Sequence, residues 1–149
     1  MKYSIDKSAL VLHSAEKMFA LVNDVQSYPL FLPWCADSAV LSSSPGEVKA
    51  SLTVAKGGFQ QQLTTRNVIA PPSSILMSLV TGPFHSLAGE WRFQSLADNA
   101  CRVSLTLEFE FSNALARVTF GPVFSHAANT MVDAFCQRAD RLYGKGSLD

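Results

Sequence analysis

Three histidines are the most chemically versatile side chains in this sequence, and their spacing argues against a reactive centre. His13, His85 and His126 lie far apart in the chain, and no pair has the HExxH spacing that holds zinc. Glu90 and Glu108 fall on the solvent-facing side of two expected strands, so they do not predict a catalytic acid pair. The GxSxG, P-loop and Rossmann glycine motifs are absent. We therefore expect no catalytic residue, no metal site and no cofactor, and a protein that is not an enzyme.

The apolar segment at residues 30–35 (LFLPWC) is the best local candidate for a binding function. Pro29 and Pro33 exclude a long helix here, so the segment is an ordered apolar connection. It forms either the lip of a pocket, with Trp34 stacking on a flat ligand ring, or a packed loop in which Trp34 plugs the core. The residue types alone leave both interpretations open.

Two expected strands carry side chains that either line a cavity or fill a core. Trp91 and Phe93 share one face of a strand with Leu87. Phe59 opens a strand rich in Gln and Thr, and if Phe59 faces inward then so does Gln61. A buried Gln needs a hydrogen-bond partner, which a quinone carbonyl would supply. The alternative is an edge strand with a loosely specified register.

Composition bounds the class of protein. The 149 residues suit one domain, and although 48% are hydrophobic, no run approaches the roughly 18 apolar residues of a membrane span. The 12 basic and 12 acidic residues cancel, which argues against DNA as a partner. No apolar leader opens the chain, and three cysteines without a CxxC motif suit a reducing compartment. We expect a single domain over residues 1–149, located in the cytoplasm, with at most peripheral membrane contact.

Hydrophobic spacing predicts the order of the elements. A strand at 4–12 precedes an N-cap at Ser14, a helix at 15–22 and a short helical turn at 25–28. Period-two alternation then predicts strands at 48–55, 59–69, 75–80, 87–94 and 101–111. Apolar residues at three and four spacing from 120 to 142 predict a long amphipathic helix, which either kinks or begins at Pro122.

These elements predict an α+β helix-grip fold. The strand at 101–111 has one apolar and one polar face, so the sheet is covered on one side. The long C-terminal helix is the only element large enough to cover it. We expect a curved antiparallel sheet of about six to seven strands wrapped on this helix, with two short helices after the first strand. A cavity can then form where the helix and the sheet separate.

The last two strands predict their own register. Leu87, Trp91 and Phe93 face inward on one strand, and Val103 and Leu105 do so on the next. Opposed residues must share a face, so the numbers of each pair must sum to an even value. The connecting loop should therefore contain an odd number of residues, either three (98–100) or five.

Several segments resemble the coenzyme Q-binding protein/RatA ribosome-association toxin family, in the polyketide cyclase/START-like superfamily. They are SYP at 27–29, FLPWC at 31–35, GPF at 82–84, EFEF at 108–111 and MVDAF at 131–135. The resemblance covers nearly the whole chain in order, and it implies a helix-grip (START-like) fold.

The resemblance implies two activities. One is the binding of ubiquinone or a related isoprenoid lipid between the sheet and the C-terminal helix, in support of respiration. The other is that of a toxin that binds the large ribosomal subunit and blocks subunit association, for which a small antitoxin would be a further partner. The residues expected to contact an apolar ligand are Phe31, Leu32, Trp34, Phe59, Gln61, Phe84, Trp91, Phe93, Phe124, Met131 and Phe135.

Overall fold

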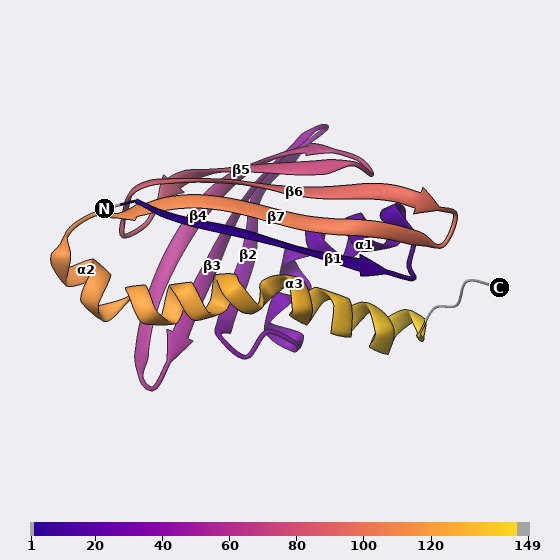
Figure 1. The fold of residues 1–149 in the computed structure, drawn as a ribbon. Coiled ribbons are helices and arrows are strands. Elements are labelled where there is room, and N and C mark those ends of the chain that lie inside the picture. The colour runs from indigo at the N-terminus through magenta and orange to yellow at the C-terminus, as the bar shows by residue number, and fades with distance from the viewer. Residues whose placement is uncertain (1, 146–149) are drawn as a thin grey trace.

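Seven strands, three α-helices and one 3-10 helix make up residues 2–145, the part of the chain described by the computed structural model (Figure 1). In chain order they are β1 (Tyr3–Val11), α1 (Ala15–Asn23), the 3-10 helix η1 (Val25–Leu30), β2 (Cys35–Ser44), β3 (Glu47–Lys56), β4 (Phe59–Ala70), β5 (Ser74–Thr81), β6 (Phe84–Ala97), β7 (Ala100–Phe111), α2 (Ala114–Thr119) and α3 (Gly121–Tyr143).

The strands form one antiparallel sheet in the order β1-β7-β6-β5-β4-β3-β2. Figure 1 shows the sheet curving, with α3 running along one of its faces. This confirms the predicted helix-grip fold. No helix within residues 2–145 has both the length and the apolar character needed to cross a bilayer.

The alternation along β7 sets the core. Its odd-numbered residues from Cys101 to Phe111 are buried, while most of the even-numbered ones stay accessible. On β6, Trp91 lies opposite Leu105 and Phe93 lies opposite Val103. The residue numbers of each pair sum to an even value, which confirms the predicted register.

The predicted length of the loop between β6 and β7 was wrong. The turn contains two residues, 98–99, and not three or five. The register shifts between Ser95 and Ala97, so Leu96 is an extra residue on β6 with 53% of its surface exposed. Such a bulge changes the parity of the pairing, so the loop no longer has to be odd.

The helix boundaries follow from local chemistry. The Lys17 N–H donates to Ser14 Oγ at 3.1 Å, as expected for an N-cap. At the other end of the chain, Phe120 separates α2 from α3, and Pro122 lies in the first turn of α3. A proline is tolerated there because a first-turn N–H has no helical partner. The long helix therefore begins at Gly121 and has no kink at Pro122.

Candidate functional site

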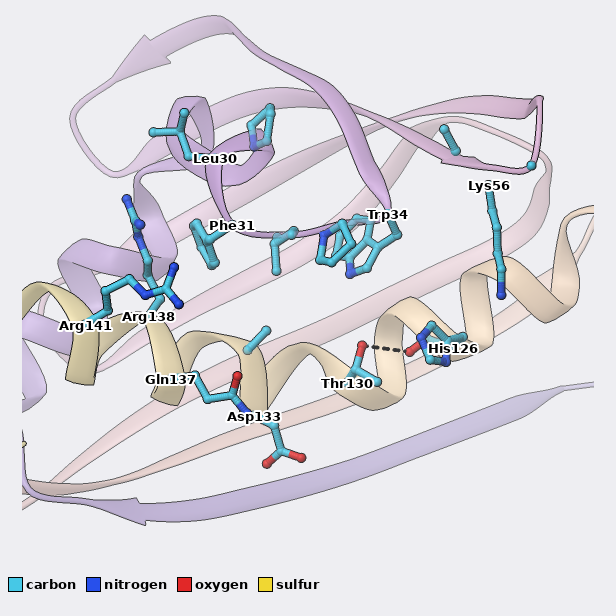
Figure 2. A pocket seen from close by; sticks show the side chains of 16 residues that line it. Leu30, Phe31, Trp34, Lys56, His126, Thr130, Asp133, Gln137, Arg138 and Arg141 are labelled. Atoms are coloured by element: carbon cyan, nitrogen blue, oxygen red, sulfur yellow. Dashed lines mark hydrogen bonds between the residues drawn. The ribbon is translucent and has the colours of Figure 1, made fainter.

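Two hollows lie between α3 and the sheet. The larger is an open groove of about 940 Å³, with a roof formed by residues 29–34 and a floor formed by α3 (Figure 2). Residues 55–57, at the turn between β3 and β4, also line it. The smaller is an inner cavity of about 80 Å³. Trp34 lines both hollows, so its side chain is the partition between them.

Backbone hydrogen bonds hold the roof segment in place. The Leu32 N–H donates to the Tyr28 carbonyl and the Cys35 N–H to the Leu32 carbonyl, each at 3.0 Å. The Ala55 N–H donates to the Trp34 carbonyl at 2.8 Å, which ties the roof to β3. Because the prolines of this segment exclude a regular helix, these bonds satisfy the backbone instead. They fix the position from which the Trp34 ring enters the interior.

The roof combines the two interpretations that the sequence left open. Leu30 is 73% exposed and forms a protruding lip. Leu32 is 1% exposed and belongs to the core, although it also borders the groove. Burial of this apolar side chain lowers the free energy of the folded state. Phe31 is half-buried and lines the groove.

Tyr28 supports the roof from inside. Its hydroxyl donates to the Val22 carbonyl, which satisfies the one polar group of a buried side chain. Burial raises the pKa of this phenol well above its usual range, so it stays a neutral donor. Its ring makes edge contacts with Phe31 and with Phe135, at centroid distances of 6.2 and 5.3 Å. The ring therefore links the roof to α3.

The inner cavity is mostly apolar. Its lining comes from five strands, from α3 and from the roof and η1: Val25, Tyr28, Trp34, Ala50, Leu52, Val54, Leu63, Thr65, Asn67, Met77, Leu87, Trp91, Leu105, Leu107, Phe124, Ala127, Ala128 and Met131. Thr65 Oγ1 donates to Asn67 Oδ1 at 2.9 Å, so part of the polar capacity of this wall is used internally.

Gln61 does not supply the polar group of this cavity. Its side chain is partly exposed, and Nε2 donates to the Gln62 carbonyl at 3.4 Å. The alternative interpretation of its strand holds only for the first part of β4: residues 59–63 pair with β3 alone, whereas from Thr64 onward β4 lies between β3 and β5. The Gln-rich residues 60–62 fall in the part of β4 that has no partner on the β5 side.

The structure brings together six of the eleven residues expected to contact a ligand. Phe31, Leu32 and Trp34 line the groove, and Trp34, Trp91, Phe124 and Met131 line the inner cavity. The remaining five, which line neither hollow, are Phe59, Gln61, Phe84, Phe93 and Phe135.

The aromatic residues outside the lining form a second layer behind it. Phe93 stacks on Trp91 with centroids 6.2 Å apart, and Phe135 meets the Trp91 ring edge-on at 5.4 Å. Phe84 packs against Phe124 at 4.9 Å. Aromatic contacts of this kind add packing energy beyond simple burial and restrict ring movement. The layer therefore sets the positions of the lining residues.

The charged side chains of the groove were not identified as site residues from the sequence. Arg138 and Arg141 lie toward one end and Lys56 toward the other, with Asp133 on the floor between them (Figure 2). The Arg138 guanidinium carbon lies 5.0 Å from the centroid of the Phe31 ring. The sequence signal was visible, but cations near a helix C-terminus are expected on account of the helix dipole alone.

The histidines occupy three different environments. His85 is exposed and His126 lines the groove. His13 is buried, and its Nε2 lies 2.8 Å from Asp140 Oδ1. Local spacing could not reveal this carboxylate partner of His13, because Asp140 is 127 residues away in the sequence. Within residues 2–145, no three His, Cys, Asp or Glu side chains gather as a metal site would require.

A small cavity between a curved antiparallel sheet and a C-terminal helix, with an apolar lining, defines a helix-grip protein of the START-like class. Residues 11–136 match the family described as polyketide cyclase / dehydrase and lipid transport. The chain is 52% identical to ribosome association toxin RatA of Pseudomonas aeruginosa over 144 residues, which cover 97% of this chain and all of that protein. It is 30% identical to the mitochondrial coenzyme Q-binding protein COQ10 homolog B of Xenopus laevis, covering 93% of this chain and 59% of that protein.

Solved structures agree on the fold. The Zhui aromatase/cyclase of Streptomyces sp. R1128 superposes with a TM-score of 0.84 at 20% identity and covers 96% of each chain. The chain belongs to the polyketide cyclase/START-like family, in the group that contains the RatA and coenzyme Q-binding proteins.

Proposed function

We propose that this protein binds a small molecule with a long apolar tail, of the isoprenoid quinone class, between α3 and the sheet. The observation that carries the proposal is the position of Trp34, which separates an open groove from an apolar inner cavity. Movement of this one side chain joins the two hollows into a path from solvent to the interior. A tail fits the apolar inner part, and a ring fits against the aromatic side chains of the roof.

The size of the inner cavity sets a condition on this proposal. Pockets for small molecules usually enclose about 300–1,000 Å³, whereas this cavity measures about 80 Å³. Binding therefore requires the cavity to expand into the groove. Trp34 is carried by a segment outside regular secondary structure, and Met131 is a flexible side chain on the opposite wall. Both can move without breaking a strand or a helix.

Burial of the tail supplies the affinity. An isoprene unit that loses about 100 Å² of accessible surface contributes roughly 2.5 kcal/mol. A few units offset the loss of translational and rotational freedom on binding. Affinity should therefore rise with tail length.

We further propose binding without catalysis. The His13–Asp140 pair is the one His–carboxylate hydrogen bond described within residues 2–145, and neither residue lines the groove or the inner cavity. A general base has to reach the proton that it removes. This pair has no such access, so we assign it to stability.

Titration with ubiquinones of increasing tail length tests the proposal, with tryptophan fluorescence as the readout. Trp34 and Trp91 both line the inner cavity, so quenching by the quinone ring is expected. Ala128→Leu fills the cavity and should weaken binding of the long-tailed quinones by about tenfold or more. Ala88→Leu, on the exposed face of β6, is the matched control and should bind normally. Affinity that is independent of tail length and unchanged in Ala128→Leu would contradict the proposal.

Ribosome association is a second candidate function, favoured by the 52% identity to a RatA protein along nearly the whole chain. In this interpretation the protein binds the large ribosomal subunit and blocks its association with the small one. Co-sedimentation of the purified protein with separated ribosomal subunits tests it. Retention on the large subunit by both wild type and Ala128→Leu would assign this activity to the outer surface and make it independent of the cavity.

A further inference from the structure

Two buried nitrogen donors on the wall of the groove have no hydrogen-bond partner within the described part of the chain. They are Nε1 of Trp34 and Nε of Arg138. Trp34 is 8% exposed, so its indole N–H is removed from solvent almost completely. Buried donors are nearly always paired in native proteins, because an unpaired one loses its hydration without compensation. Both donors line the same groove, which is where an acceptor would have to lie.

The positive charge at the Arg138 end of the groove indicates that the missing acceptor is an anion. Arg138 and Arg141 are three residues apart on α3, so their side chains lie on one face of the helix. No carboxylate within residues 2–145 forms an ion pair with either arginine. Asp140, their neighbour in sequence, is hydrogen-bonded to His13 instead. Two cations at this spacing repel each other unless an anion lies between them.

Arg138 has an apolar neighbour on the roof side of the groove. Arg138 lies over the Phe31 ring, and the roof continues from there to Trp34 and the inner cavity. Figure 2 shows both arginines at the Leu30 and Phe31 end of the groove, away from Lys56. A cationic site therefore adjoins an apolar path. Arginine guanidinium groups bind phosphate and carboxylate in a fork geometry, which makes them suited to an acidic head group.

We propose that the groove is a binding site for acidic single-chain amphiphiles. The phosphate or carboxylate lies between Arg138 and Arg141, with the Arg138 Nε–H donating to one of its oxygen atoms. The tail runs beneath the roof into the inner hollow. This inference rests on the proposed function, because it uses the same path for the tail. It adds a second ligand class, because quinones are uncharged and the arginines would select an acidic head group on a similar tail.

A matched pair of probes tests the inference. Geranylgeranyl monophosphate and geranylgeraniol have the same tail and differ in the acidic group, and inorganic phosphate tests the head alone. We expect the monophosphate to bind at least about tenfold more tightly than the alcohol, since a charged hydrogen bond contributes enough for that factor. Its affinity should fall as salt is added, whereas that of the alcohol should not. Inorganic phosphate alone should bind far more weakly than either probe.

Variants locate the head group. Arg141→Gln removes an exposed charge and should weaken the monophosphate by about tenfold while leaving the alcohol unchanged. Arg138→Lys keeps the charge but removes the fork, and should give a smaller loss in the same direction. Arg102→Gln, on the outer face of β7, is the control and should change neither affinity.

The outcomes separate this inference from the proposed function. Equal affinity for the two probes, or a monophosphate affinity that both arginine variants leave intact, overturns the acidic head-group site while tail binding still stands. Binding of inorganic phosphate as tight as that of the monophosphate also overturns it, because the ligand would then be a free anion. Failure of both probes and of every quinone to bind removes the proposed function and this inference together.

Discussion

His13 and Asp140 join the two ends of the domain. The Nε2 of His13, in the turn between β1 and α1, lies 2.8 Å from Oδ1 of Asp140, near the end of α3. The imidazole is 4% exposed and the carboxylate 46% exposed. Without this bond the imidazole would have no water to replace its partner, whereas the carboxylate would still be hydrated. Ring contact with Tyr143, at a centroid distance of 5.9 Å, closes the same junction.

Removal of this bond should destabilise the fold. We expect His13→Ala to lower the free energy of unfolding by about 1–3 kcal/mol, because a buried polar contact and its packing are lost. Asp140→Asn should cost less, since its carboxylate is half in solvent. Urea unfolding of the two single variants and the double variant measures the coupling. The exposed His85→Ala is the control, and a His13→Ala variant as stable as that control would contradict the assignment.

Phe135 should be among the most sensitive positions of α3. The ring is fully buried and contacts Tyr28, Phe31 and Trp91 at centroid distances of 5.3, 5.3 and 5.4 Å. Phe135→Ala should cost roughly 3–5 kcal/mol in denaturant unfolding. Leu115→Ala, at a position that is 73% exposed on α2, should change stability by less than about 0.5 kcal/mol. A loss below about 1 kcal/mol for Phe135→Ala would mean that α3 is not the cover of the sheet.

Gly89 should not tolerate a side chain. A Cβ at this position would lie 2.7 Å from Leu107 Cδ1 and 2.9 Å from the Thr106 carbonyl oxygen. The backbone oxygen cannot move without disturbing the β6–β7 pairing, so Gly89→Ala should destabilise by about 1–3 kcal/mol. The neighbouring Ala88→Val points outward and serves as the control. Thermal or urea unfolding that ranks the two variants equally would show that the strands separate easily here.

The three thiols should react slowly while the protein is folded. Burial is the main cause that raises the pKa of Cys35, Cys101 and Cys136 to about 11, from an ordinary value of 9.0. Since only the thiolate reacts, labelling with a disulfide reagent at pH 8 should be about a hundredfold slower than in urea. Equal labelling rates in the folded and unfolded chain would contradict these shifts.

The same shifts predict how stability changes in alkali. Between pH 9 and 11 the unfolded chain releases its thiol protons and the folded chain keeps them. The unfolded state then binds fewer protons, so the free energy of unfolding falls as pH rises through this window. Replacement of Cys101, which is fully buried, by Ala should flatten this part of the profile. An unchanged slope would assign the alkaline loss to other groups.

Several features of the site could not be read from local patterns. Leu30 and Leu32 have the same side chain two positions apart, yet one is 73% and the other 1% exposed. The segment has neither helical nor strand periodicity, so its sequence carries no information about which side chain turns inward. Strand parity put Gln61 inward only if Phe59 also faced inward, and near the start of β4 both side chains are partly exposed.

The sequence by itself determined the fold class and the inward faces of the long strands. Alternation along β7 and the apolar stripe of α3 are properties of neighbouring residues, and each shows in the order of the chain. The tertiary structure alone decided which distant groups meet: Asp140 with His13, Trp34 with the two hollows, and Arg138 with Phe31. The physical reason is that periodicity specifies the direction of a side chain relative to its own element. The packing of one element on another then decides what lies in that direction.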